Sequence, residues 1–511
     1  MKRNNLTTAV LAGITGIAGI ASVSNAVNLN SDGVGQVLVY PYYTVNGNNN
    51  TLISVVNTTA DVKAVKVRFL EGKNSRECLD FNLYLSPYDV WAAALVNHTS
   101  ANLSATYDNQ NSVKLVLDGV SPDTSCTAPA INGQQFLPWG FDPEGNGVTG
   151  DGYDRGGRDL QRCTEGHFEM IEMGTVVNTA TNGNAANAAT HLTTGSPASC
   201  STIVGNWAAG GRWTQTPSAA DPTAGPNDGL VAPDGTGGLF GSATILDGEI
   251  GTAISYNADA IQSYSTNIQH SDTGNQTPDL STGNNSVSNI FNNGLVQSDD
   301  WNTSNIQAIS ALYMHNNIYG EYELRDQFNA NTEMVVTFPT KFAYVDAFRG
   351  IFAAASIPFE PFEVAFTGTA CEEYAINMWD REEQIPRDDV APVIPSPLPP
   401  GIISTVPLFC YETNVLELHN NAVPTDGSVS EILQSSLVTH WATTATSAPS
   451  YFGNGWVALN FTQLTDDNAA GATYTGLPVT GFTVQRYVNN TSASKNYASI
   501  FGHRYSKSIS N

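Results

Sequence analysis

Gln36-Val-Leu-Val-Tyr-Pro-Tyr-Tyr43 decides the fold class, because it is an apolar and aromatic run of strand length. Asn46-Gly47 follows as a turn, and Thr51-Leu-Ile-Ser-Val-Val-Asn57 is the next predicted strand, so the two runs predict a hairpin. Residues 62–70 alternate in polarity, which predicts a half-buried strand. Short strands with a turn signal every ~8–12 residues are typical of a β-sandwich.

The strand pattern covers residues 27–175 and returns after residue 301. We therefore predict an all-β protein of antiparallel, immunoglobulin-like sandwich units, with a first sandwich over 27–175 and a second β domain over 301–511. Residues 176–300 are rich in Asn, Gly, Thr and Ser and predict a loop-rich insert, with two strands near 242–246 and 252–256.

Three features are expected within the second β domain. Residues 306–315 predict a strand, and the prolines of 386–409 predict a stiff, extended loop. Residues 428–437 predict a short helix, because Ser428 and Glu431 have the spacing of a capping box.

Residues 1–26 have the pattern of a secretory signal peptide. Lys2 and Arg3 precede an uncharged stretch, and Ser24-Asn25-Ala26 offers small side chains to a signal peptidase. The alternative, a membrane anchor, is disfavoured by the many Gly, Ala, Ser and Thr residues. No second segment approaches the length of a membrane span. We expect an exported protein at the cell surface or outside the cell, with the periplasm as second choice.

The charge of the chain excludes some partners. It has 21 Lys and Arg against 47 Asp and Glu, a net charge of −26, so nucleic acid and anionic membrane surfaces are poor partners. Only 13% of its residues are charged. A composition low in charge and rich in hydroxyl and amide side chains is typical of extracellular β proteins with Asn/Gly turns.

Six cysteines form an even set, which predicts three disulfides in an oxidising compartment. They are Cys78, Cys126, Cys163, Cys200, Cys371 and Cys410. The sequential pairing is favoured, because each bridge then closes a polar, loop-like segment. A metal site would need closely paired ligands such as C-x-x-C, and there are none.

Residues 142–159 contain a candidate calcium loop. The oxygen ligands Asp142, Glu144, Asn146, Asp151 and Asp154, with Asp159 beyond them, lie among glycines, and Ca²⁺ takes about six to eight oxygens in flexible geometry. The alternative is a polar turn in which Arg155 and Arg158 neutralise the carboxylates. Calcium is the one cofactor that the sequence suggests.

Two further groups of side chains are weighed as sites. His167 and Glu169 share one face of a predicted strand and could serve acid–base chemistry, but a structural surface histidine is the more common reading. Trp207 and Trp213, within the polar insert, are candidates for binding sugar rings. Gly145–Gly150 matches G-x-G-x-x-G but lacks the strand and helix of a dinucleotide site.

Several stretches resemble a set of uncharacterised secreted proteins of Gram-negative bacteria. The resemblance is carried by residues 39–43 and 57–59, by 65–71 with 83–91, by 166–174, and by 335–341 and 476–482. It implies export and a cell-surface or matrix setting, and it brings no activity or catalytic residues.

The function expected from the sequence is that of a non-enzymatic cell-surface or extracellular-matrix protein, structural or adhesive. Export, low charge density and the lack of a catalytic constellation or G-x-S-x-G elbow favour it. The alternative is a secreted carbohydrate-binding or glycan-active protein. The expected partners are other surface or matrix components, with glycans as one class among them.

Overall fold

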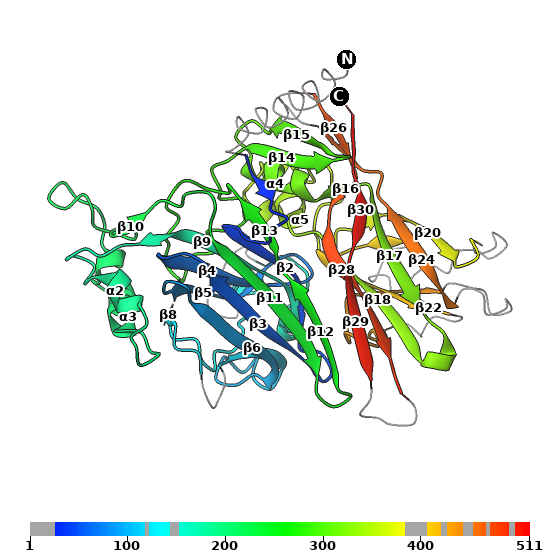
Figure 1. The fold of residues 1–511 in the computed structure, drawn as a ribbon, viewed down its shortest axis with the longest axis horizontal. Coiled ribbons are helices and arrows are strands. Elements are labelled where there is room, and N and C mark those ends of the chain that lie inside the picture. Colours follow the sequence, from blue (N-terminus) through cyan, green and yellow to red (C-terminus); the bar gives the residue numbers. More distant parts are fainter. Residues whose placement is uncertain are drawn as a thin grey trace, which may run out of the picture.

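The structure is a computed structural model that describes residues 26–117, 122–143, 153–383, 406–420, 427–442, 453–466, 471–489 and 496–510. Antiparallel strands are the main regular structure of these residues and helices are few, which confirms the prediction of an all-β protein. Figure 1 shows two groups of strands side by side. The predicted signal peptide lies outside the described residues apart from Ala26, as does most of the Pro-rich loop, of which 406–409 are described.

The first group of strands holds two sheets. The larger has the order β1 (Asn28–Leu29), β13 (Asp259–Gln262), β2 (Val37–Thr44), β9 (Glu165–Val176), β4 (Val62–Glu71), β5 (Glu77–Leu85) and β8 (Cys126–Ala128), with β10 (Leu230–Val231) paired to β9. The other has the order β12 (Thr252–Asn257), β11 (Leu239–Asp247), β3 (Asn49–Asn57), β6 (Val90–Thr99) and β7 (Asn111–Val116).

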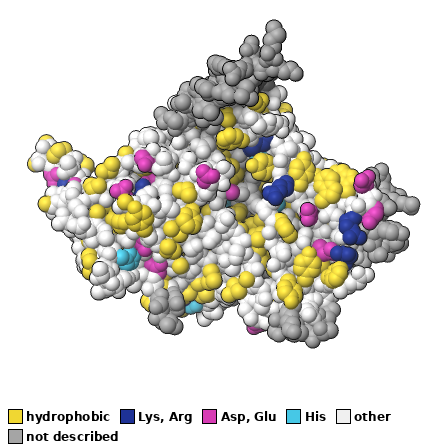
Figure 2. All heavy atoms as spheres, viewed as in Figure 1, with side chains coloured by type: hydrophobic (Ala, Val, Ile, Leu, Met, Phe, Trp, Pro, Cys, Tyr) yellow, Lys and Arg dark blue, Asp and Glu magenta, His cyan; other side chains and the backbone are white. Residues whose placement is uncertain are grey.

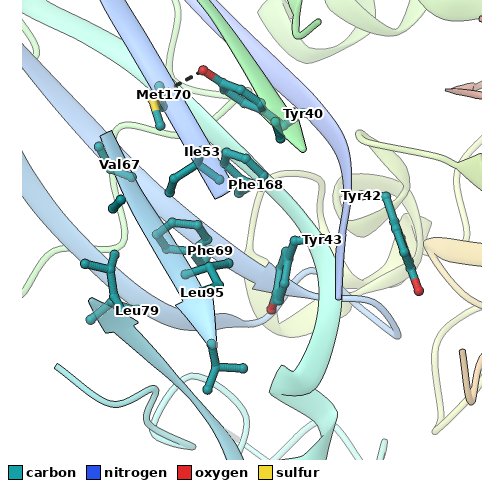
Figure 3. Packing of buried hydrophobic residues seen from close by; sticks show 14 of the residues in the cluster. Tyr40, Tyr42, Tyr43, Ile53, Val67, Phe69, Leu79, Leu95, Phe168 and Met170 are labelled. Carbon is teal, nitrogen blue, oxygen red and sulfur yellow. Dashed lines mark hydrogen bonds between the residues drawn. The ribbon is translucent and has the colours of Figure 1, made fainter. Parts of the chain in front are cut away.

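One apolar core joins these two sheets. All eight residues of β2 are buried, whereas β3 alternates between buried and more exposed residues. Tyr40 stacks on Phe168 at 4.1 Å, and Tyr43 packs edge-on against Phe69 at 6.0 Å. Figure 3 shows that Tyr42 points to the other side of β2 from these rings. The two sheets therefore pack as a sandwich, while the finer prediction of immunoglobulin-like units stays a prediction.

Strand β4 is buried on both faces, so the prediction of a half-buried strand is wrong. Its basic side chains are neutralised inside the sheet, where Lys63 pairs with Glu172, Lys66 with Asp80, and Arg68 with both Glu77 and Glu169. A buried charge is tolerated when it is paired in this way. The basic residues that alternate with apolar ones in β4 therefore mark buried ion pairs and not a face open to solvent.

The second group of strands also holds two main sheets. One has the order β23 (Val438–Ala442), β22 (Thr413–His419), β18 (Ala330–Thr337), β28 (Thr480–Tyr487) and β29 (Tyr497–Gly502). The other has the order β20 (Ala375–Asp380), β24 (Asn454–Asn460), β17 (Asn317–Glu323) and β30 (Arg504–Ser506). The pairing of β22 with β23 is parallel, and the other pairings in these sheets are antiparallel.

Short elements connect the sheets. The small sheets pair β14 (Val287–Asn292) with β15 (Leu295–Asp300), β16 (Met314–His315) with β27 (Leu477–Pro478), β19 (Glu372–Glu373) with β21 (Leu408–Phe409), and β26 (Thr473–Thr475) with both β25 (Leu464–Asp466) and β31 (Ser508–Ser510). Within the described residues the helices are α2 (Ala185–Ala189), α3 (Cys200–Trp207), α4 (Asn305–Tyr313) and α5 (Lys341–Val345), with 3-10 turns η2 (Leu160–Thr164), η3 (Arg212–Thr214), η4 (Asp326–Phe328), η5 (Ala347–Arg349) and η6 (Ala354–Ser356). Among the described residues, none of the helices has the length and apolar character needed to cross a bilayer.

The predicted insert over 176–300 belongs in part to the first sandwich. Strand β11 pairs with β3 over nine residues, and β13 lies between β1 and β2. Residues 242–246 and 252–256, expected as strands, lie within β11 and β12. The predicted boundary at residue 176 therefore separates β11, β12 and β13 from the two sheets to which they belong.

The two groups of strands share their cores. Val335, Val415 and Phe482 of the second group belong to the same buried cluster as Tyr40 of the first. Tyr256 of β12 stacks on Phe482 of β28 at 4.9 Å, and the Thr337 hydroxyl donates to the Pro41 carbonyl. In Figure 1 the two groups meet where β12 lies beside β29.

Two predicted elements are wrong. Of the strand predicted over 306–315, residues 306–313 lie in helix α4, while Met314 and His315 form β16. The pattern misled because every residue of α4 is buried, so no polar face marks the helical period. The predicted helix over 428–437 is a series of turns, because its backbone N–H groups bind buried carboxylates. The backbone N–H of Glu431 donates to the Glu417 carboxylate, and those of Ile432 and Leu433 donate to the Glu333 carboxylate.

The six cysteines form three disulfides, as expected, but the predicted sequential pairing is wrong for two of them. Cys78 pairs with Cys163 and Cys126 with Cys200, while Cys371 pairs with Cys410. Although β8 lies next to β5, Cys126 is opposite Tyr84 and so lies far along β5 from Cys78. The two cysteines are therefore apart, and their bridges to Cys163 and Cys200 interleave in the chain.

Candidate functional site

The outward side of the β20-β24-β17-β30 sheet carries the most distinctive set of exposed side chains. Register places Trp379 opposite Trp456, and Trp456 opposite Glu321. Two residues further along each strand lie Asn377, Ala458 and Tyr319. The alternate residues of these strands, such as Met378, Val457 and Ile318, point into the core. The sheet therefore has one apolar face and one face of aromatic and amide groups.

The aromatic rings on this side form a continuous row. Trp379 and Trp456 stack with their ring centroids 4.1 Å apart and their planes 13° apart. Tyr319 lies 6.1 Å from Trp456 in an edge-on arrangement. Trp456 is 39% exposed, and Trp379 and Tyr319 are half-buried.

A ladder of amides continues from the aromatic row. Asn377 donates to Asn460 at 2.6 Å, Asn460 donates to Asn317, and Asn317 donates to the Ser506 hydroxyl at 2.9 Å. The Tyr319 hydroxyl reaches the same Ser506 hydroxyl at 3.2 Å. We call the set of Trp379, Trp456, Tyr319, Asn317, Asn377 and Asn460 the tryptophan face.

The tryptophan face has the chemistry of a surface that binds uncharged polar chains. Indole and phenol groups combine a large apolar body with a polar edge. Amide groups both donate and accept hydrogen bonds, so they can bind hydroxyl groups in either role. Glu321 and Arg504 lie on this side, as does Glu323, which is paired with Arg325, so charges of both signs are present.

Trp207 and Trp213, the tryptophans weighed from sequence, pack into a third buried cluster. Trp213 is 1% exposed, stacks on Tyr84 with an angle of 8°, and donates its indole N–H to the Asp228 carbonyl. Trp207 is half-buried and donates to the Tyr84 hydroxyl at 2.7 Å. A sugar-binding role for these two stays a prediction, but Trp213 offers it no exposed ring face.

The candidate calcium loop is described only in part. Glu144, Asn146 and Asp151 lie outside the described residues. Asp142 pairs with Arg158, and Asp154 accepts two hydrogen bonds from Arg162 at 2.8 Å. Pairing with arginine was the alternative to calcium, and Arg158 takes that role for Asp142. Calcium binding at this loop stays a prediction.

His167 and Glu169 lie side by side on β9, but both are buried, so the expectation of a surface histidine is wrong. Burial lowers the pKa of His167 to about 3, with Arg68 acting in the same direction. Burial raises the pKa of Glu169 to about 7 although Arg68 binds it directly. Glu169 belongs to the ion-pair network inside the sheet, whereas His167 contacts the hydroxyls of Ser75 and Thr413. Both side chains are buried and have no open access for a substrate.

Asp89, His191 and Thr124 form the arrangement closest to a hydrolytic triad. Asp89 lies 3.5 Å from His191 Nδ1, and the Thr124 hydroxyl lies 3.1 Å from His191 Nε2. However, the Ser86 hydroxyl binds His191 Nδ1 at 2.8 Å, nearer than Asp89, and Thr124 also donates to the Gly195 carbonyl. These contacts hold the 190–195 turn beside the Cys126–Cys200 disulfide, which gives the arrangement a structural role.

A groove of about 630 Å³ opens between the two groups of strands. Its lining is mixed: apolar residues such as Leu29, Phe291 and Ile318 are accompanied by about as many polar ones, among them Asn257, His315 and His503. Burial raises the pKa of Asp259 to about 6 although Thr480 donates to it, and burial lowers the pKa of Lys507 to about 7. The groove could hold a small molecule, but these residues specify no ligand class.

Among the described residues, one group of side chains has the donor set of a metal centre. It consists of Glu417, His419 and His440, whose ligand atoms lie within 4.8 Å of one another. No local motif marks this group in the sequence, since the two histidines lack the short spacing of a helical or hairpin metal motif.

We find no match to a protein-family model, to a curated protein or to a solved structure.

The tryptophan face was missed in the analysis of the sequence, because Trp379 and Trp456 are isolated in the chain. One signal could have revealed Trp379: it follows Asn377 on the polar side of an alternating run in which Ile376 and Met378 are the apolar positions.

Proposed function

We propose that this protein is an exported, non-enzymatic component of the cell surface or extracellular matrix, and that it adheres by binding uncharged glycan at the tryptophan face. The observation that carries the proposal is the partly exposed stack of Trp379 and Trp456 beside the amide ladder. The C–H faces of sugar rings pack against aromatic rings, while amides bind sugar hydroxyls.

Three further properties support this setting. Three disulfides are typical of proteins in an oxidising compartment outside the cytoplasm. Figure 2 shows a face on which uncharged side chains predominate and charged ones are scattered. The third is the resemblance of several stretches to secreted proteins of Gram-negative bacteria. We also propose that the sandwich units are immunoglobulin-like.

Affinity electrophoresis of the purified chain tests the glycan part of the proposal. Gels that contain soluble xylan, dextran or hydroxyethyl cellulose are compared with gels that contain none. We expect at least one of these polysaccharides to retard the wild-type chain. Trp456→Ala and Trp379→Ala should weaken binding about tenfold, since an aromatic contact contributes about 0.5–1.5 kcal/mol beyond its buried area.

Phe348→Ala is the control, because Phe348 is 52% exposed and lies in η5, outside both the tryptophan face and the groove. This variant should bind as the wild type does. Equal retardation of all the variants, or no retardation of the wild type by any neutral polysaccharide, would contradict glycan binding at this face.

A further inference from the structure

Glu417, His419 and His440 meet at the edge of the five-stranded sheet. Strand β23 is the edge strand, and its parallel pairing with β22 places His440 directly opposite Glu417. His419 lies two residues after Glu417 and therefore on the same face of β22. Two strands thus bring two imidazoles and one carboxylate together.

The three ligand atoms form a nearly equilateral triangle. Glu417 Oε2 lies 2.8 Å from His440 Nδ1 and 3.1 Å from His419 Nε2. The two imidazole nitrogens lie 3.1 Å from each other. Each atom is therefore at contact distance from both of the others.

The three facing atoms need something to bridge them, because a carboxylate oxygen and an imidazole lone pair both accept hydrogen bonds. On its other side, His440 Nε2 lies 3.2 Å from the Ser428 carbonyl oxygen and 3.3 Å from the Ser428 hydroxyl, so either tautomer of His440 has a partner there. One proton can bridge one edge of the triangle well, whereas a metal ion can satisfy all three atoms at once.

We infer that Glu417, His419 and His440 bind a divalent first-row transition metal ion, with Zn²⁺ as the probe of choice. An ion bonded at about 2.1 Å to each atom would lie roughly 1.2 Å above the triangle, in the range of zinc–nitrogen and zinc–carboxylate bonds. Two imidazoles and one carboxylate suit such ions, whereas Ca²⁺ and Mg²⁺ prefer sites made of oxygen.

The surroundings of the three side chains are those of a supported metal site. The Ser428 carbonyl orients His440, and Glu417 Oε1 accepts a hydrogen bond from the Glu431 N–H at 2.9 Å. Such outer contacts fix the orientation of metal ligands and raise their basicity. His440 and Glu417 are almost fully buried, while the His419 side chain is 16% exposed, so the site opens to solvent on the His419 side.

Zinc titration of the metal-free full-length chain tests this inference, with isothermal calorimetry as the measurement. We expect one Zn²⁺ per chain, and no heat at this site from Ca²⁺. His419→Ala should bind Zn²⁺ at least about tenfold more weakly, since even outer contacts of metal ligands contribute about 10–100-fold. His440→Gln should remove binding.

His98→Ala is the control, because His98 lies on β6 in the first group of strands, outside the cluster. It should bind Zn²⁺ as the wild type does. Should His440→Gln fail to fold, the test rests on His419→Ala, because the His419 side chain is partly exposed and the variant should fold. Circular dichroism of this variant and of the wild type checks its fold. No binding by the wild type, or unchanged binding by His419→Ala, would overturn the inference.

Discussion

His270 is a buried side chain whose protonation is fixed by its neighbours. It is 3% exposed and lies edge-on to Trp213. Its Nδ1 faces the Pro226 carbonyl oxygen and so carries the hydrogen, which leaves Nε2 to accept from the Tyr84 hydroxyl at 2.8 Å. Trp207 donates to the same hydroxyl. This chain of hydrogen bonds holds helix α3, which ends at Trp207, against β5 of the first sandwich.

The stability of the protein should therefore fall in mild acid through His270. Burial lowers the pKa of His270 to about 4, below that of an unfolded histidine, so the unfolded chain binds more protons between about pH 6.5 and pH 4. His270→Gln should lower stability at pH 7 and flatten its pH dependence in this window by about 2–3 kcal/mol. Urea unfolding at pH 7 and pH 4.5 measures both effects. A pH dependence equal to that of the wild type would contradict this role.

At the scale of single residues, the sequence pointed to tryptophan as a candidate binding residue but did not show which tryptophans are exposed. Trp207 and Trp213 were noticed because they lie in a polar stretch, but that stretch folds against β5 and buries Trp213. Trp379 and Trp456 were overlooked because only strand pairing makes them neighbours. A contact between residues 77 positions apart in the chain leaves no local pattern.

The 430–437 segment shows how buried carboxylates can replace regular secondary structure. Glu165 of the first group of strands accepts hydrogen bonds from the Ser435 hydroxyl and from the N–H and hydroxyl of Ser436. Glu333 of the second group accepts from Ile432 and Leu433. The segment is therefore fastened to both groups of strands, and its backbone has no need of a helix.

Glu165→Gln should loosen this segment. The amide would turn an N–H group toward donors that the carboxylate accepts, and a buried unsatisfied donor costs about 1–3 kcal/mol. Urea unfolding should show that loss, and hydrogen exchange should show reduced protection of residues 430–437. Glu431→Gln is the control in the same segment, because the Glu431 side chain is 58% exposed. Similar stability of both variants would contradict the fastening role of Glu165.

The interleaved disulfides make a second prediction for these elements. Peptide mapping without reduction should recover Cys78 with Cys163 and Cys126 with Cys200. Replacing Cys126 and Cys200 together by Ala should lower the free energy of unfolding by up to about 4 kcal/mol, as the chain-entropy model gives for a loop of this length. Recovery of Cys78 linked to Cys126 would contradict the pairing.

The whole molecule is one body, because the cores of its two groups of strands are continuous. Val27, Val37 and Ile261 of the first group lie in the same cluster as Met334 and Leu416 of the second. We expect a single unfolding transition, with coincident curves from tryptophan fluorescence and far-ultraviolet circular dichroism. Two separated transitions would contradict the shared core.

At this scale the sequence predicted the all-β class and several strands, because alternation and turn residues are local signals. It could not predict how residues 239–262 enter the first sandwich, since that placement depends on pairing with β3 and β2. The group of Glu417, His419 and His440 was missed for the same reason, because the parallel pairing of β22 with β23 brings it together. Contacts between distant strands are what the candidate sites are made of.

Adhesion of living cells to a glycan-coated surface tests the proposed function most directly. A strain that lacks the chain would be complemented with the wild type or with Trp456→Ala, and equal export of both would be checked by protease shaving. The proposal predicts that the wild type restores adhesion to the polysaccharide that retards it in gels, whereas Trp456→Ala does not. Equal adhesion with both chains, or no change when the chain is absent, would contradict it.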